Sequence, residues 1–170
     1  MNWEALGAIG EIVGAIAVVL TLIYLSTQIR QSTRQQRAES QRAVGEEFNR
    51  LMQVLYDVEK AGMIFRAYSN WAESTAQEQM TLSIHLVEFS NHLQTILSLW
   101  QNGGLEESAY ISQEENFLSM LSTNGGKEWW SIWSNLIGGD FSARINEKLA
   151  TRTYPGITEV IPWANVKHWK

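Results

Sequence analysis

The chain opens with a long apolar run that contrasts with the polar sequence after it. Residues 5–25 read ALGAIGEIVGAIAVVLTLIYL and contain one ionisable side chain, Glu11. At about 1.5 Å per residue, a helix of this length crosses the roughly 30 Å hydrocarbon core of a bilayer. The flanking sequence offers neither the basic start nor the small-residue cleavage site of a signal peptide. We therefore expect residues 1–25 to form a transmembrane anchor.

The next stretch is polar almost all round but rich in good helix formers. Residues 26–56 contain no proline and one glycine, Gly45, with many Gln, Arg, Glu and Ala residues. This composition predicts that the membrane helix continues without a break to about Tyr56, with residues 26–43 as a helical neck. A polar helix gains little from burial, so the neck is expected to lie against neighbours.

Helical periodicity resumes at Val44 and predicts a helical domain over residues 44–150. Asp57–Tyr68 is expected to form a short helix broken at Gly62. Thr75 and Glu78 have the spacing of a capping box, which predicts a helix start. The apolar positions that follow recur every three or four residues to Gln101, after which Gly103 and Gly104 favour a stop. We take this helix as the centre of the core.

Three shorter segments complete the predicted domain. Ser112 and Glu115 repeat the capping-box spacing and predict a helix that ends at the glycines of 124–126. A tryptophan-rich helix is expected over 128–137, and Asp140 is expected to cap a last helix over 141–149. Residues 151–170 hold both prolines and are expected to form an extended tail, in which only 158–161 alternates like a strand. The fold class is therefore all-α: a membrane helix, a neck, a compact bundle and a tail.

Charge and composition limit the classes of function. The chain has 13 Lys and Arg against 18 Asp and Glu, a net charge of -5, and no cysteine. An acidic chain is a poor general nucleic-acid binder, so no nucleic acid is expected as a partner. The absence of cysteine excludes disulfides and thiolate metal sites. It also agrees with a reducing, cytoplasmic location for the domain.

Basic residues gather on one side of the apolar run and predict its orientation. No Lys or Arg precedes the run, whereas four arginines follow it closely, which we call the neck arginines: Arg30, Arg34, Arg37 and Arg42. By the positive-inside rule the N-terminus lies outside and the domain lies in the cytoplasm of a bacterial cell, with the anchor in the inner membrane. The neck arginines are also expected to contact lipid headgroups.

A regular pattern of small residues lies within the apolar run. The small-residue stripe recurs at spacings of 3, 4, 3 and 4 and comprises Gly7, Gly10, Gly14, Ala17 and Thr21. The same spacing continues through Tyr24 into the glutamine stripe, Gln28, Gln31 and Gln35. Small residues let helices approach closely in lipid, so the stripe predicts self-association. The alternative is that Gly and Ala are simply frequent in membrane helices.

Glu11 lies beside the small-residue stripe and leaves three interpretations open. A carboxylate within the bilayer costs about 2.5–3.5 kcal/mol at the centre, so it is not expected to face lipid. A protonated Glu11 would hydrogen-bond between subunits, whereas an ionised one would need water and hence a lumen. In the third interpretation, Glu11 reaches the outer headgroups together with Glu4.

Candidate chemistry in the domain is sparse. His85, Glu88 and His92 share one side of the central helix, but no established metal-binding motif accompanies them, and we expect no metal. Trp129, Trp130 and Trp133 are expected in the core or on a docking surface. No phosphate loop or nucleophile elbow is present, so neither an enzyme nor a cofactor is expected.

Several segments resemble a widespread group of small bacterial single-pass membrane proteins. They are WEALGAIGEIVGAIAVVLTLIYLSTQIRQSTR near the N-terminus, FSNHLQTILSLWQNGGL in the middle, and GGKEWWSIW with FSARINEKL later. The resemblance covers all but the last 20 or so residues. It implies an anchor, a YLxxQIRQxTR-like neck and a helical cytoplasmic domain, and it carries no known activity.

Together these patterns predict an inner-membrane protein that forms a homo-oligomer and acts as a scaffold or a pore-like assembly. The partners expected are the lipid bilayer and further copies of the chain. The alternative is an anchored helical module that binds a cytoplasmic protein without forming a pore. The sequence does not identify such a partner.

Overall fold

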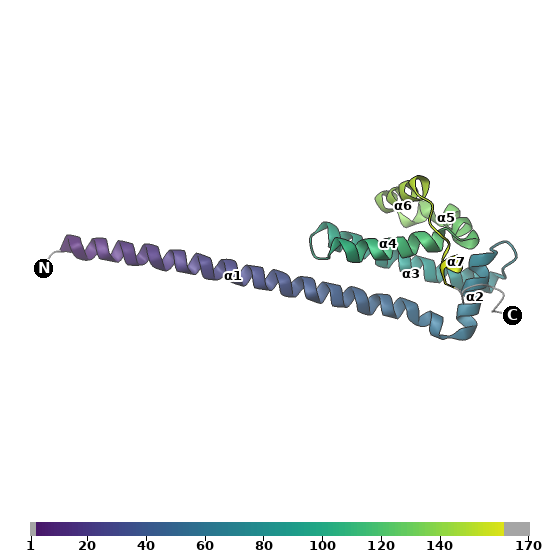
Figure 1. Ribbon diagram of the computed structural model, residues 1–170, viewed down its shortest axis with the longest axis horizontal. Coiled ribbons are helices and arrows are strands. Elements are labelled where there is room, and N and C mark those ends of the chain that lie inside the picture. The colour runs from purple at the N-terminus through teal and green to yellow at the C-terminus, as the bar shows by residue number, and fades with distance from the viewer. Residues whose placement is uncertain (1–2, 162–170) are drawn as a thin grey trace. The chain divides into compact units, whose positions relative to one another are not determined.

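In the computed structural model the described residues are 3–161, without the side chains of 4–6, and they form helices and no strand. The all-α prediction is therefore confirmed. The elements, labelled in Figure 1, are α1 (Trp3–Met52), the 3-10 helix η1 (Gln53–Tyr56), α2 (Val58–Ser69), α3 (Ala76–Gln101), α4 (Glu107–Leu121), α5 (Asn124–Ile137), α6 (Gly139–Thr151) and α7 (Ile157–Val160).

The chain divides into two compact units, Met1–Glu39 and Ser40–Lys170. The described part of the first unit is a single helix, the first portion of α1. This helix is long and apolar enough to cross a membrane. The second unit contains the end of α1 and all the other helices.

The long N-terminal helix is unbroken to Met52, close to the predicted end at Tyr56. The last turn differs from the prediction, because Gln53–Tyr56 tighten into a 3-10 helix. Asp57 then leaves helical geometry, and its carboxylate accepts hydrogen bonds from the backbone N–H groups of Glu59 and Lys60. Such a cap satisfies otherwise unpaired donors and starts α2.

Helices α2 and α3 pack on each other at the centre of the second unit. The predicted capping box is confirmed: Thr75 Oγ1 accepts from the Glu78 backbone N–H, and the Glu78 carboxylate accepts from the Thr75 N–H at 2.8 Å. The predicted break at Gly62 is wrong. Gly62 is buried inside a continuous α2, where packing outweighs the roughly 1 kcal/mol that glycine costs a helix.

The end of α3 follows the prediction and the start of α4 does not. Gly103 has φ of 71°, and the N–H groups of Gly103 and Gly104 donate to the carbonyls of Trp100 and Leu99, which is a Schellman motif. The predicted start at Ser112 is wrong, because α4 begins at Glu107. The earlier start places the fully buried Tyr110 on α4, where its ring stacks on Trp100 with centroids 5.0 Å apart.

The second glycine pair begins a helix rather than ending one. Thr123 caps α5 by accepting from the Gly126 N–H, so Gly125 and Gly126 lie in its first turn. A Cβ on either glycine would overlap a backbone carbonyl oxygen, that of Ala67 or that of Met120. These glycines are needed for close packing, and the predicted stop at 124–126 is wrong.

The predicted cap of the last long helix also moves. Gly138, with φ of 107°, is the residue before α6, and Asp140 lies within the first turn instead of capping it. Glycine adopts this positive φ without the steric penalty of a side chain. A carboxylate in the first turn still favours the helix through the helix dipole.

The core of the second unit runs between α3, α4 and the α5–α6 pair (Figure 1). Phe89 of α3 stacks on Phe117 of α4 with centroids 5.7 Å apart. Phe117 in turn meets the edge of Trp130 on α5 at 5.9 Å. The predicted stripe on α3 is buried at Leu82, Leu86, Phe89, Leu93 and Ile96. This aromatic layer joins helices that are distant in sequence.

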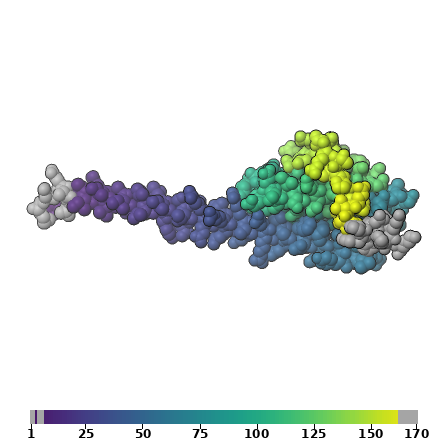
Figure 2. Space-filling view, in the orientation of Figure 1, coloured from purple at the N-terminus to yellow at the C-terminus, as the bar shows by residue number. Residues whose placement is uncertain are grey.

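The segment after α6 lies on the surface of the bundle (Figure 2). The Ser119 hydroxyl donates to the Pro155 carbonyl at 2.6 Å, and the Tyr154 side chain is buried. The extended prediction is wrong for Ile157–Val160, which form the helical turn α7 and not a strand. The remainder of the predicted tail, 162–170, lies outside the described residues.

Candidate functional site

The first candidate site is the small-residue stripe on α1. Because α1 has no break, the spacing of 3, 4, 3 and 4 keeps these residues along one side of the helix. All the stripe residues are exposed within the single chain. A Cβ added at Gly7, Gly10 or Gly14 would meet no atom within 4 Å. At these three glycines the surface of the helix is therefore narrow, with no described atom against it.

Local hydrogen bonds suit this stretch to an apolar environment. The Thr21 hydroxyl donates to the Ala17 carbonyl at 2.8 Å. This hydroxyl therefore already has a hydrogen-bond partner, as a polar group in lipid requires. Further along, the Gln28 amide donates to the Tyr24 hydroxyl at 3.1 Å. That contact couples the first residue of the glutamine stripe to the position before it. Gln31 and Gln35 are exposed on the same helix.

Glu11 and the neck arginines of α1 are all exposed in the structure. Glu11 is exposed, and so are Arg30 and Arg34. Arg42 is exposed as well, but its Nε lies 2.8 Å from the Glu46 carboxylate and it belongs to the second unit. An exposed pair of this kind contributes little to stability. Arg37, between Arg34 and Arg42 in sequence, is also exposed.

The second unit contains a charged group that sequence reasoning missed, here called the acid–base cluster: Tyr110, Glu114, Arg144 and Lys148. Glu114 on α4 is 1% exposed, and its Oε1 accepts from Arg144 Nε at 2.6 Å and from the Tyr110 hydroxyl at 2.6 Å. Lys148 Nζ lies 3.3 Å from its Oε2. The Arg144 guanidinium also lies over the Trp100 and Tyr110 rings.

Electrostatics keep this buried carboxylate ionised. Burial alone would raise the pKa of Glu114, but the hydrogen bonds from Arg144 and Tyr110, with the nearby positive charges, hold the pKa below its ordinary value. Burial and the hydrogen bond to Glu114 raise the pKa of Tyr110 well above its usual range. The cluster is thus a fixed structural bridge between α4 and α6.

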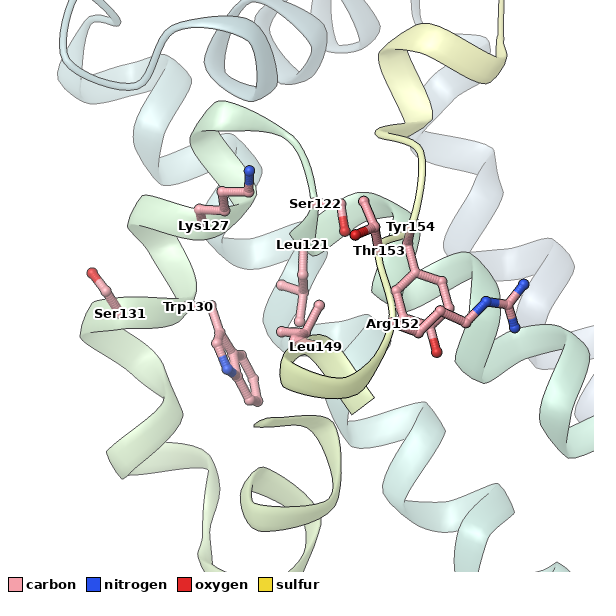
Figure 3. Close-up of a pocket in the computed structure, with 9 residues that line it drawn as sticks. All are labelled: Leu121, Ser122, Lys127, Trp130, Ser131, Leu149, Arg152, Thr153 and Tyr154. Carbon is pink, nitrogen blue, oxygen red and sulfur yellow. The ribbon is translucent and has the colours of Figure 1, made fainter. Parts of the chain in front are cut away.

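A pocket of about 350 Å³ in the second unit is the second candidate site. We call it the tail pocket; Figure 3 shows its lining residues: Leu121, Ser122, Lys127, Trp130, Ser131, Leu149, Arg152, Thr153 and Tyr154. They come from the end of α4, the α4–α5 connection, α5, the end of α6 and the segment after it. Of these residues, the sequence had singled out only Trp130, as part of a tryptophan cluster.

The histidine and carboxylate triplet on α3 does not converge on a point. His85 is buried and its Nδ1 has no hydrogen-bond partner, whereas Glu88 is exposed. His92 Nε2 lies 2.6 Å from the Gln113 side-chain oxygen. Among residues 3–161, no group of three or more potential metal-binding side chains is found. Burial lowers the pKa of His85 to about 4, so it is neutral at pH 7.

The three clustered tryptophans serve the core. Trp129 and Trp130 are buried, and Trp133 is half-buried with its ring stacked on Trp129 at 5.8 Å. The Trp130 indole N–H donates to Asn146 at 2.7 Å, which fixes the ring at the edge of the tail pocket.

Comparison with protein-family models, with curated proteins and with solved structures finds no match for this chain.

Proposed function

We propose that this protein is a homo-oligomeric membrane scaffold or pore-like assembly, whose copies meet along the small-residue stripe of α1. The observation that carries the proposal is the continuity of α1 from Trp3 to Met52. An unbroken helix carries the heptad-like spacing from the small-residue stripe into the glutamine stripe, and two helices that supercoil around each other keep such a line in contact. A single contact line then runs from the apolar segment into the neck.

The interactions that would hold two copies together differ between the apolar segment and the neck. In lipid, helix association depends on close packing, which Gly10 and Gly14 permit because they carry no side chain. In water, the glutamine stripe would pair amide groups between neighbouring copies. The spacing of 3 and 4 is that of a left-handed coiled coil, which keeps two helices in contact over such a length.

The proposed location is a bacterial inner membrane with the N-terminus outside and the second unit in the cytoplasm. The arginines after the apolar run support this orientation. Arg30 and Arg34 are exposed on the neck, where they would reach anionic lipid headgroups. We also propose membership in the group of small single-pass proteins that the sequence resembles. In this proposal the protein has a structural role and catalyses no reaction.

Self-association is tested by crosslinking and native mass spectrometry of the full chain in detergent. Gly10→Leu and Gly14→Leu place bulk on the stripe and should convert the oligomer to monomer. Ile9 and Ile16 lie on the side of the helix away from the stripe, so Ile9→Leu and Ile16→Leu are controls that should leave assembly intact. A wild-type chain that is monomeric at every concentration contradicts the proposal.

The scaffold and the pore differ in what Glu11 does. In a pore, Glu11 would lie near water in a lumen, and Glu11→Gln should change ion flux into liposomes. In a packed scaffold it would hydrogen-bond between helices, and neither the wild type nor the variant should conduct. Flux measurement on both proteins therefore selects one form of the assembly.

The second candidate function is an anchored module that binds a cytoplasmic protein. One observation favours it: Ile132 and Leu136, one helical turn apart on α5, are 55% and 74% exposed. Contiguous exposed apolar side chains mark interaction surfaces, and these two would form part of one. In that case Ile132→Ser with Leu136→Ser should abolish partner recovery after crosslinking in cells, without changing self-association.

A further inference from the structure

The tail pocket has the size and the composition of a small-molecule site. Ligand pockets are typically about 300–1,000 Å³, mostly apolar with a few polar groups, and this pocket lies at the small end of that range at about 350 Å³. Its apolar surface comes from Leu121, Trp130 and Leu149. Figure 3 shows Lys127, Ser122 and Thr153 on one side of Leu121, and the Trp130 ring on the other. The pocket is therefore polar at one end and apolar at the other.

Several contacts hold the walls in place before any ligand arrives. The indole N–H of Trp130 is fixed by Asn146, as described above. On the opposite wall, Arg152 pairs with Glu115 at 3.0 Å, and its guanidinium lies 5.0 Å from the centre of the Tyr154 ring. A preformed pocket loses less conformational entropy when it binds than a mobile one does.

The polar groups differ in what they offer a ligand. The hydroxyls of Ser122 and Ser131 already donate to backbone carbonyls, those of Leu118 and Glu128, so they present only acceptor lone pairs. The Lys127 ammonium and the Thr153 hydroxyl make no hydrogen bond or ion pair within residues 3–161. Among the described residues nothing occupies these two donors, and both lie at the polar end.

The number of positive side chains in the tail pocket indicates which ligand charge the pocket can balance. The Arg152 side chain pairs with Glu115 and points away from Trp130 in Figure 3, so Lys127 is the cation at the polar end of the pocket. Lys127 and Thr153 are exposed, so the charged group of a ligand would stay near water at this end. One lysine cation balances a monoanion, whereas a phosphate dianion would keep one charge unbalanced.

We propose that the tail pocket binds a small amphipathic carboxylate, a one- or two-ring aromatic acid or a short-chain acid. The carboxylate accepts from Lys127 Nζ and Thr153 Oγ1, and the apolar part packs on Trp130, Leu121 and Leu149. This site lies wholly within the second unit, so it is independent of the assembly proposed for α1.

The test uses the full chain in lipid nanodiscs free of detergent, with 6-fluoro-2-naphthoate as the probe and ¹⁹F NMR as the readout. Empty nanodiscs correct for partitioning into lipid. We expect saturable binding to one site per chain. Lys127→Met should weaken it about tenfold because it removes a charge-assisted hydrogen bond. Thr153→Val should weaken it by a smaller factor.

Matched controls distinguish binding in the tail pocket from nonspecific binding of the probe to the protein. Lys60→Met removes another exposed lysine, which pairs with Asp57 at 3.4 Å outside the pocket, and should leave affinity unchanged. The neutral 6-fluoro-2-naphthamide should bind the wild type more weakly and should be insensitive to Lys127→Met. The proposal is overturned by an absence of saturable binding, or by equal affinity of the acid for the wild type and Lys127→Met.

Discussion

Arg144 on α6 and Glu114 on α4 form an ion pair with Nε and Oε1 2.6 Å apart, in which the carboxylate is 1% exposed and the arginine side chain 31% exposed. The pair bridges two helices whose residues are 30 positions apart. A buried carboxylate requires such partners, because an unpaired charge in the interior is costly. Glu114 therefore adds a charged contact between α4 and α6 to the ring contact of Phe117 with Phe141.

Glu114→Gln should lower the free energy of unfolding by about 2 kcal/mol, because it removes the charge that Arg144 and Lys148 share while leaving the shape of the side chain. Chemical denaturation of the full chain, followed by circular dichroism, measures this change.

The neighbouring acid provides the control. Glu115 pairs with Arg152, but both side chains are about half or more exposed. Glu115→Gln should therefore change stability by at most about 0.5 kcal/mol. Equal losses in the two variants would show that burial of Glu114 has no special energetic role.

His85 should make stability depend on pH between about 6.5 and 4. Burial lowers its pKa from 6.5 to about 4, so in this window the unfolded chain binds a proton that the folded chain does not. Stability contributed by the neutral ring is complete above pH 6.5 and is lost as the pH falls, by about 3 kcal/mol at pH 4. Unfolding measured across this range detects the slope.

His85→Gln removes this titrating ring and should reduce the slope in that window, while His92, whose pKa burial also lowers, retains part of it. The ionised carboxylate of Glu114 should affect stability at lower pH. Its pKa in the folded chain is depressed, so the stability that it contributes is complete above the ordinary pKa of about 4.3 and is lost as the pH falls below that value. Glu114→Gln should therefore retain the slope between pH 6.5 and 4. A slope unchanged by His85→Gln contradicts the assignment.

Gly125→Ala and Gly126→Ala should each destabilise the bundle strongly, because the new Cβ would overlap backbone oxygens that cannot move independently. We expect losses of about 3 kcal/mol or more, as for other severe overpacking. Thermal unfolding of the full chain measures them. Gly45→Ala is the control: nothing lies within 4 Å of its Cβ, and it should stabilise α1 by about 0.5–1 kcal/mol.

The absence of cysteine makes the orientation of the chain directly measurable. Ala72→Cys places a single thiol in the exposed turn between α2 and α3. In intact spheroplasts a membrane-impermeant maleimide should fail to label it, and labelling should appear after permeabilisation, since the second unit is proposed to be cytoplasmic. Labelling of intact cells would reverse the orientation.

Local sequence determined the features that depend on neighbouring residues. Thr75 and Glu78 predicted the start of α3 because a capping box needs only residues three apart, and Gly103 predicted its end because a positive φ suits glycine. The length and polarity of residues 5–25 predicted a helix able to cross a membrane. Each of these depends on a single segment of chain.

Tertiary contacts decided what the same local signals meant elsewhere. Ser112 and Glu115 repeat the capping-box spacing but lie inside α4, because burial of Tyr110 against Trp100 extends that helix toward its N-terminus. Gly125 and Gly126 look like a stop but permit contact with Ala67 and Met120. The bridge from Glu114 to Arg144 and the tail pocket join residues distant in sequence. No local pattern encodes such neighbours, because packing between helices brings them together.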